Sequence, residues 1–349
     1  MFTISVCMIV KDEQEVISRI LNCAKKFADE IIIVDTGSKD NTINICKTYT
    51  QNIYHFEWCN DFAKARNFSF SKATGDYIMW LDSDDLISLE NIQKIIRLKS
   101  TEDPADCYMF KYVMGFVEGT PTFEFYRERL LKNSSDFKWV GFVHEAIAPH
   151  GNIVYTNIEI EHRKIKTSDP KRNLKLYRYA IRHGVAFNPR EQYYYSRELY
   201  FNGHYKKAIT ELKYYLKSGD TYIPNITGAH LILAKCYLAT NQPQKAKLTL
   251  VDSISTYMPS SETCCILANT FEILQKIDMA ILWYNIALIT PKNNDGFVQK
   301  DYYDYIPYIE LCRLYYKLDY NKSKYYFLKA KELKNNSNEI KHNQPFFDK

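Results

Sequence analysis

Short apolar runs, each ending in polar residues, mark the first half of the chain. Residues 4–10, 30–34 and 77–81 have the length and composition of buried strands. Polar loops and then amphipathic helices follow the first two runs within the first fifty residues. This repeated order predicts a mostly parallel sheet with right-handed crossovers. We therefore expect an α/β domain whose polar loops meet at the carboxyl edge of the sheet.

The third run ends in the acidic segment Asp82-Ser83-Asp84-Asp85. An Asp-x-Asp pair at the end of a strand can hold a hard divalent cation, which in turn can hold a diphosphate. The same acids would also suit the N-terminus of the helix expected after them. Taken alone, the segment is compatible with both interpretations.

The neighbouring strands favour a ligand site. Asp12 or Glu13, Asp35 and Asp82 would all lie at the carboxyl ends of adjacent strands. Carboxylates in such a crevice can accept hydrogen bonds from a uracil N–H and from ribose hydroxyls. The chain has no Gly-x-Gly-x-x-Gly sequence and no Walker loop, which disfavours dinucleotide and P-loop ATP binding. A nucleoside is the ligand that this pattern indicates.

Taken in order, these segments resemble the start of family 2 glycosyltransferases with the GT-A fold. The resemblance is carried by residues 6–13, 33–38, 40–42, 60–67 and 80–84, and it extends over the first half of the chain. It implies a Rossmann-like GT-A domain, a nucleotide-sugar donor that is usually a UDP-sugar, a Mn²⁺ or Mg²⁺ ion, and inversion at the anomeric carbon.

The resemblance also assigns roles to individual acids. By position, Asp12 or Glu13 and Asp35 match contacts to uridine. Asp82 matches a contact to the ribose or to a metal-bound water, and Asp84 matches a direct metal ligand.

A second cluster of polar residues follows in the stretch 139–145, Trp-Val-Gly-Phe-Val-His-Glu, which is similar to one in the sugar-transferring members of the family. An inverting transfer needs a carboxylate to take the acceptor's proton, and Glu145 suits that role, with Asp85 or His144 as alternatives. His162 lies where related enzymes place a third metal ligand, and His144 competes for this role. A neutral imidazole favours Mn²⁺ over Mg²⁺. Either histidine could instead be a partly buried side chain without a ligand.

Arginines near these acids have two interpretations each. Arg66 and Asn67 are candidates for contacts to the diphosphate, because arginine offers phosphate oxygens a fixed fork of donors. The alternative is a helix cap and an ion pair with Asp61. Arg127 and Arg129 alternate on an expected strand and therefore face the same way. A solvated strand edge explains this pair more simply than one wall of an acceptor groove does.

From about residue 170 onward the strand pattern gives way to paired amphipathic helices rich in tyrosine. A tight turn followed by a small residue recurs, and the small residues are Ala208, Ala246, Ala280 and Ser323. Their spacing is close to the tetratricopeptide period of about 34 residues. Small residues at fixed positions let paired helices approach closely and stack. The region therefore resembles about four tetratricopeptide-like repeats.

We place the domain boundary at Asp169-Pro170, because proline interrupts regular structure and restricts the residue before it. The expected division is a catalytic domain at 1–168, an all-α helical-repeat domain at 169–335 and a polar tail at 336–349.

Composition excludes several other classes of protein. The formal net charge of +5 is too small to indicate nucleic-acid binding. The nine cysteines form no Cys-x-x-Cys pair, which favours free thiols in a reducing cytoplasm over disulfides or a zinc site. No apolar stretch approaches the roughly 20 residues of a membrane span, and no secretion signal is visible at the N-terminus.

We therefore predict a metal-dependent inverting glycosyltransferase that moves a sugar from a UDP-sugar to a Ser/Thr hydroxyl or Cys thiol of a peptide or protein. The acceptor follows from a resemblance to bacterial peptide S/O-glycosyltransferases and from the repeats, which offer a concave binding surface or a homodimer interface. One alternative is a saccharide acceptor in surface-glycan synthesis. Another is a non-catalytic repeat scaffold with a vestigial GT-A domain, against which the intact Asp82, Asp84, Glu145 and His162 argue.

Overall fold

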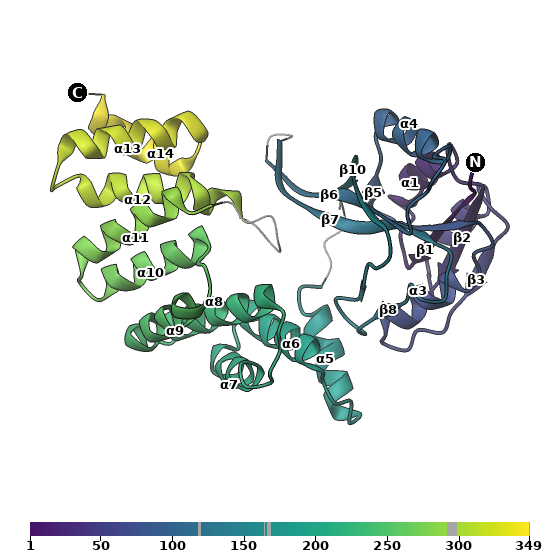
Figure 1. Ribbon diagram of the computed structural model, residues 1–349, viewed down its shortest axis with the longest axis horizontal. Coiled ribbons are helices and arrows are strands. Elements are labelled where there is room, and N and C mark those ends of the chain that lie inside the picture. The colour runs from purple at the N-terminus through teal and green to yellow at the C-terminus, as the bar shows by residue number, and fades with distance from the viewer. Residues whose placement is uncertain (118–119, 164, 166–168, 292–298, 349) are drawn as a thin grey trace. The chain divides into compact units, whose positions relative to one another are not determined.

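The computed structural model describes residues 1–117, 120–163, 165, 169–291 and 299–348 of the chain. The chain divides into two compact units, Met1–Leu176 and Tyr177–Lys349. The first unit is an α/β domain and the second consists of helices (Figure 1), which confirms the expected fold class. The division falls within α5 (Arg172–Arg182), whereas the sequence places the boundary before Pro170. The division into a catalytic domain at 1–168 and a repeat domain at 169–335 therefore stays a prediction.

An eight-stranded sheet forms the centre of the described part of the first unit, with the strand order β3-β2-β1-β4-β7-β6-β10-β5. The strands β1 to β4 are mutually parallel, β7 runs antiparallel to both of its neighbours, and β6 and β10 run parallel to each other. The strand bounds are β1 Ile4–Val10, β2 Glu30–Asp35, β3 Ile53–His55, β4 Tyr77–Trp80, β5 Asp85–Leu86, β6 Cys107–Val117, β7 Thr120–Lys132 and β10 Ile153–His162.

Both faces of this sheet are covered, which explains why its central strands are apolar throughout. On one face, Val6 and Met8 of β1 join a core with α1 (Ile17–Ala24) and α4 (Leu89–Leu98). On the other face, Cys7 lies in a core that α3 (Phe62–Phe70) helps to cover. The short helix α2 (Thr42–Cys46) follows β2. The register pairs Val10 with Asp35 across β1 and β2, so the polar loops after these strands begin side by side.

A small two-stranded sheet completes the first unit. It consists of β8 (Trp139–Val140) and β9 (Ala146–Ile147), which pair antiparallel. Trp139 packs into a core with Trp80 and with Ala63 of α3. The turn between β8 and β9 therefore carries residues 141–145 next to the end of β4.

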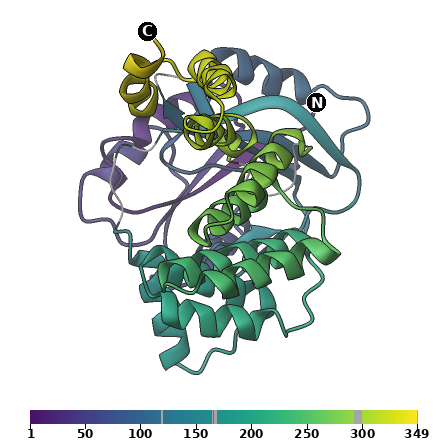
Figure 2. The same ribbon diagram turned by 90° about the vertical axis from the view of Figure 1, so that its left-hand side faces the viewer.

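Within the described part of the second unit, four helix pairs follow one another, as the sequence predicts (Figure 1 and Figure 2). The predicted small residues, Ala208, Ala246, Ala280 and Ser323, are fully buried, each in the second helix of its pair. The pairs are α6 (Pro189–Phe201) with α7 (Tyr205–Tyr215), α8 (Ile223–Ala239) with α9 (Pro243–Thr256), α10 (Ser261–Ile273) with α11 (Ile277–Ile289), and α12 (Tyr305–Tyr315) with α13 (Tyr320–Leu333). A short 3₁₀ helix, Lys300–Tyr303, precedes α12.

The turns inside the first three pairs share one backbone geometry. Gly203, Asn241 and Gln275 have positive φ angles of 75°, 56° and 59°. In each case the next N–H donates to a carbonyl of the preceding helix, for example His204 N–H to the Leu199 carbonyl at 2.8 Å. This is the left-handed helix ending that glycine and asparagine adopt most readily.

The prediction of a polar tail at residues 336–349 is wrong, because most of these residues form the helix α14 (Asn338–Phe347). Ser337 caps this helix by accepting a hydrogen bond from Ile340 N–H at 3.1 Å. Ile340 and Phe347 are buried, and the Phe347 ring stacks on Phe327 of α13 with centroids 4.5 Å apart. A closing helix of this kind covers the apolar side that the last repeat would otherwise expose. None of the described helices is both long and apolar enough to cross a membrane.

Candidate active site

The loops after β1 and β2 are held together by hydrogen bonds between their polar residues. The Lys39 N–H donates to Asp12 Oδ1 at 2.6 Å, and the Asp12 N–H donates to Ser38 Oγ at 3.0 Å. The Ser38 N–H in turn donates to Asp35 Oδ1 at 2.9 Å. Ser38 therefore links two of the acids that the sequence proposes for uridine binding. Asp12 has a φ of 55°, so its backbone takes the left-handed form that aspartate tolerates in such turns.

A cavity of about 240 Å³ opens beside these loops. Glu13 lies on its wall and donates its N–H to Thr42 Oγ1 at 2.7 Å. The volume is below the roughly 300–1,000 Å³ of most small-molecule sites, so the cavity can receive only part of a nucleotide sugar. Its lining residues are Asp12, Glu13, Gln14, Glu15, Val16 and Asp40.

Arg66 of α3 joins two predicted site carboxylates. Its Nη2 lies 2.7 Å from Asp82 Oδ1, and its Nε lies 2.8 Å from Glu145 Oε1. The guanidinium is buried against the rings of Trp80 and Trp139, 5.1 and 4.8 Å from their centroids. The structure therefore brings the end of β4 and the turn after β8 together through one arginine.

The charges in this group set its protonation. Burial alone would raise the pKa of Asp82, but the positive charges of Arg66 and Arg129 outweigh burial and hold this pKa well below its usual range. Burial alone would lower the pKa of Arg66, but Asp82 and Glu145 raise it. Asp82 is therefore an anion at neutral pH and Arg66 a cation.

The alternative pairing of Arg66 with Asp61 is wrong. Asp61 instead caps α3 and accepts a hydrogen bond from Lys64 N–H at 2.9 Å. Asn67 is committed to the backbone of Trp139, because its Nδ2 donates to the Trp139 carbonyl and its Oδ1 accepts from the Trp139 N–H, both at 2.9 Å. Asn67 thus fixes β8 in place, which argues against a contact of its amide to the diphosphate.

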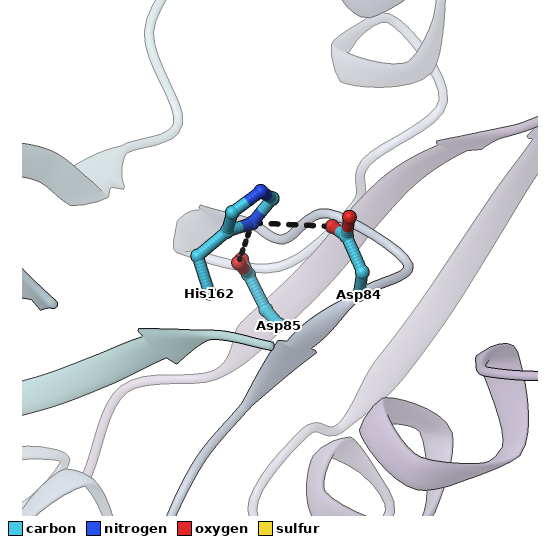
Figure 3. A group of neighbouring side chains, drawn as sticks. All are labelled: Asp84, Asp85 and His162. Atoms are coloured by element: carbon cyan, nitrogen blue, oxygen red, sulfur yellow. Dashed lines mark ion pairs between the residues drawn. The ribbon is translucent and has the colours of Figure 1, made fainter. Parts of the chain in front are cut away.

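Asp84, Asp85 and His162 form a group whose possible metal-ligating atoms lie within 4.8 Å of one another (Figure 3). The His162 Nδ1 is 3.3 Å from Asp84 Oδ1 and 3.6 Å from Asp85 Oδ1. Strand pairing explains the meeting, because His162 at the end of β10 lies opposite Asp85 in β5. In addition, the Arg163 N–H donates to the Asp84 carbonyl at 2.9 Å.

Asp85 is the buried anchor of this group. Its Oδ2 accepts from Arg129 Nη1 and from the Asp82 N–H, both at 3.0 Å, and its Oδ1 accepts from the Tyr112 hydroxyl at 2.9 Å. The side chains of Asp85 and Arg129 are both inaccessible to solvent. Asp85 therefore does not suit the role of an alternative catalytic base, because a base must reach the acceptor.

The interpretation of Arg129 as part of a solvated strand edge is wrong. Its guanidinium lies between the rings of Trp80 and Tyr112, 3.6 and 4.2 Å from their centroids. Its Nε and Nη2 have no hydrogen-bond partner in the described part of the chain. Arg127 does face the same way as Arg129, since its guanidinium carbon also lies over Trp80, 4.8 Å from the ring centroid. Arg127 binds the Glu128 carboxylate, with its Nη2 at 3.0 Å from Oε1.

Sequence reasoning missed the buried ion pair of Arg129 with Asp85, and it missed Tyr112 as a part of the site. The signal for Arg129 was its place directly before Leu130 and Leu131, since an arginine within an apolar strand usually has a buried carboxylate as its partner. Tyr112 gave no such signal, because one tyrosine in an aromatic-rich strand is unremarkable.

The donor set of Asp84 and His162 fits a divalent cation. Their side chains are each 20% exposed, so an ion can reach both, whereas Asp85 is closed off. Burial lowers the pKa of His162, but hydrogen bonds to Asp84 and Asp85 outweigh burial and raise this pKa from 6.5 to about 10. In the metal-free protein the imidazole is therefore protonated, and its positive charge compensates the negative charges of the Asp84 and Asp85 carboxylates.

His144 is not part of this group. It lies in the turn between β8 and β9 and has a φ of 54°. Among the residues that the structure describes, the one cluster of acidic, histidine or cysteine side chains close enough to share a metal contains His162 instead. The geometry thus favours His162 over His144 as the metal ligand.

The chain is similar to several known proteins. Residues 5–156 match the model of glycosyl transferase family 2. The SPbeta prophage-derived glycosyltransferase SunS of Bacillus subtilis is 28% identical over 277 residues, which cover 74% of this chain and 64% of the relative. A TPR repeat-containing protein of Synechococcus elongatus is 33% identical over 147 residues, which cover 42% of this chain and 36% of that protein. In both cases the match spans less than two thirds of the relative's length.

Among solved structures, that of S. aureus TarS is similar with a TM-score of 0.42 and 14% identity, over 70% of this chain and 54% of TarS. This likeness is too loose to align individual site residues. The family match covers β1 to β4 and the acidic segment after β4, and it ends within β10. These residues place the N-terminal domain of this chain in glycosyltransferase family 2.

Proposed function

We propose that the chain is a metal-dependent inverting glycosyltransferase that moves a sugar from a UDP-sugar to a side chain of a peptide or protein. One observation carries the proposal. The acidic segment after β4 contacts His162 through Asp84 and Asp85, and it contacts Glu145 through Asp82 and Arg66. A metal site and a candidate base are thus attached to the same strand end.

The donor nucleoside binds at the carboxyl edge of the sheet in this proposal. Asp12, Glu13 and Asp35 accept hydrogen bonds from the uracil and the ribose, and the cavity beside Asp12 and Glu13 receives part of the nucleoside. Asp82, held as an anion by Arg66, is the candidate contact to the ribose or to a water molecule at the metal. These roles place the diphosphate over the acidic segment after β4.

Asp84 and His162 would hold the divalent cation, and the buried Asp85 would orient His162. A nitrogen ligand beside a carboxylate favours Mn²⁺ over Mg²⁺. When bound, the cation supplies the positive charge that neutralises the departing diphosphate. His162 gives up one proton to bind it, since only an imidazole nitrogen without a proton is a ligand.

Glu145 takes the proton of the acceptor as the acceptor attacks the anomeric carbon from the side opposite the diphosphate. Arg66 holds Oε1, so the carboxylate is fixed in orientation before the acceptor arrives. The proton goes to the other oxygen, Oε2. The products are the glycosylated side chain with an inverted anomeric centre and UDP.

The repeat unit supports a peptide or protein as the acceptor. Stacked helix pairs commonly bind extended peptides or other chains. Its second helices carry exposed apolar side chains, among them Tyr214, Leu248, Leu282 and Leu328. The same surface is a candidate for contact with a second copy of the chain. All nine cysteines are free and only Cys59 is exposed, which is compatible with the reducing cytoplasm that we propose as its location.

A panel of nucleotide sugars tests the donor and metal parts of this proposal without knowledge of the acceptor. Purified protein is incubated with UDP-, GDP- and TDP-sugars in Mn²⁺, in Mg²⁺ or in EDTA, and released nucleotide is measured. We expect slow release of UDP with Mn²⁺, less with Mg²⁺ and none in EDTA. Release that is equal in EDTA would contradict the metal site, and release from only another nucleotide would contradict the donor. Peptide and oligosaccharide mixtures added to the active condition then identify the acceptor class.

A further inference from the structure

We propose that an open edge of β7, residues 124–128, binds an extended segment of the acceptor as an added β-strand. The inference rests on the proposed function, because it takes a peptide or protein as the acceptor. The edge aligns the short segment that receives the sugar, whereas the repeats bind the rest of the acceptor.

The strand β7 has a partner along the whole of one side but only at one end of the other. On one side β6 pairs with it from Leu131 to Thr120. On the other side β4 pairs only with residues 130–132. Within the described part of the chain, no other strand pairs with that side of β7. Residues 124–128 therefore form an open edge that begins where β4 ends.

Two contacts show which way the main-chain groups of β6 point. The Cys107 N–H donates to the Asn152 carbonyl at 3.1 Å, and the Met109 carbonyl accepts from Thr156 Oγ1 at 3.2 Å. Both residues therefore direct these groups toward the β10 side. Because successive residues of a strand alternate in this direction, Tyr112 directs its groups toward β7.

The same alternation leaves two residues of β7 facing outward. Phe125 lies opposite Tyr112 and therefore exchanges hydrogen bonds with β6. Glu124 and Tyr126, on either side of Phe125, direct their N–H and carbonyl groups to the open side. None of the described residues forms a main-chain hydrogen bond with Glu124 or Tyr126 from that side.

This edge leads to the candidate base. At its end the Glu128 carbonyl accepts a hydrogen bond from Trp80 Nε1, which confirms that alternate residues face the β4 side. The Trp80 ring also contacts the Arg66 guanidinium, 5.1 Å from its centroid, and Arg66 Nε lies 2.8 Å from Glu145 Oε1. A strand added along residues 124–128 therefore directs its end toward Glu145.

An extended peptide is the occupant that suits this edge. A row of main-chain donors and acceptors is complemented by the main chain of another strand. Glu124 is exposed and forms no ion pair with any described residue, so a cationic side chain opposite it is favoured. A second copy of the chain, paired edge to edge around Glu124 or Tyr126, would instead oppose two glutamates.

A proline at position 126 tests the main-chain hydrogen bonds. Tyr126→Pro removes the outward N–H, which β6 does not use, so β7 should persist. Tyr126→Thr keeps the N–H, and both variants lose the ring contact with Tyr155 at 4.9 Å. The probes are fluorescein-labelled peptides of alternating threonine and valine with one central serine, titrated with full-length protein by fluorescence anisotropy. We expect Tyr126→Pro to weaken binding by about tenfold or more and Tyr126→Thr to change it by less than about threefold.

Modified peptides test the same contact on the unchanged protein. A peptide N-methylated at every second residue keeps one complete edge of N–H groups and should bind like the unmodified peptide. A peptide N-methylated at every residue should not bind. A lysine beside the serine should strengthen binding relative to a glutamate there, and Glu124→Lys should reverse this preference.

The outcomes separate this inference from the proposed function. Absence of peptide binding, equal binding by Tyr126→Pro, or equal binding of the fully methylated peptide would overturn the inference. Self-association that Tyr126→Pro abolishes, measured by sedimentation, would overturn it in favour of a second copy. Should Tyr126→Pro fail to fold, the methylated peptides still decide. Peptide binding of the expected pattern without any release of UDP from UDP-sugars would instead refute the proposed reaction and leave the edge standing.

Discussion

Arg66 and Glu145 form an ion pair in which Nε lies 2.8 Å from Oε1. This contact joins α3 to the turn that precedes β9, and it orients the candidate base before any substrate is present. The same guanidinium also holds Asp82. A change in the orientation of Arg66 would therefore displace both Glu145, the candidate base, and Asp82, the proposed contact to the donor.

Glu145→Gln keeps the size of the side chain and an oxygen that can accept from Arg66, but it removes the proton acceptor. We expect Mn²⁺-dependent UDP binding to survive in calorimetry. With a hydroxyl acceptor, the rate of transfer should fall by roughly 10²–10⁴, the usual contribution of a positioned general base. With a thiol acceptor, raising the pH should restore much of the rate, because the thiolate needs no base.

A control variant for this test is Glu159→Gln, which alters a half-buried carboxylate of β10 that pairs with Lys111 at 3.7 Å. Its rate should stay near normal. Near-normal transfer by Glu145→Gln at neutral pH would instead show that the base is another group, for which His144 is then the candidate.

Asp84→Ala should abolish Mn²⁺-dependent binding of UDP and turnover of the UDP-sugar while leaving the fold intact. The reason is that Asp84 is one of the two accessible candidate ligands in the group that it forms with Asp85 and His162. Calorimetry measures the affinity, and circular dichroism checks the fold. Asp103→Ala, in an exposed loop, serves as the control. Unchanged Mn²⁺-dependent UDP affinity in Asp84→Ala would contradict the proposed metal site.

Arg129→Met should destabilise the protein by about 3–5 kcal/mol, the usual result of removing one partner from a buried ion pair. The Asp85 carboxylate would remain in a site closed to solvent with its charge no longer compensated by Arg129. Adding Asp85→Asn to Arg129→Met should recover part of the loss, because the amide carries no charge. Urea unfolding of the two single variants and the double variant measures these differences. Strictly additive losses would show that the two side chains do not depend on each other.

A shortened protein that contains residues 1–176 should bind UDP with Mn²⁺ and lose transfer to a peptide or protein acceptor. The first compact unit contains every proposed donor and metal residue, so donor chemistry has no need of the repeats. Binding is measured by calorimetry on monodisperse protein, and transfer is measured with the acceptor found in the panel. Full transfer by the shortened protein would assign acceptor recognition to the first unit.

The sequence predicted those features that depend on local pattern. The apolar runs at 4–10, 30–34 and 77–81 appear as β1, β2 and β4, because buried parallel strands are apolar throughout. The small residues of the repeats were also visible, because Ala208 and Ala246 recur at a fixed place after a turn.

The parts that sequence could not supply depend on pairing between distant segments. Asp84 and Asp85 look alike in sequence, yet only the pairing of β5 with β10 and the burial of Arg129 make Asp85 an anchor. The sequence did not predict the last helix, α14, for a different reason. Ile340 and Phe347 stand among polar neighbours in the sequence, and their burial depends on packing against the distant Phe327.

The position of His162 has a practical consequence for how this catalytic unit is cut out or transplanted. The family match ends at residue 156, inside β10 (Ile153–His162). A protein designed to end there would keep the acidic segment after β4 but lose the imidazole, the strand that pairs with β5 and the Arg163 N–H that holds the Asp84 carbonyl. An excised domain must run past β10 to retain both proposed metal ligands, so the limits of the recognisable family sequence are narrower than those of the working site.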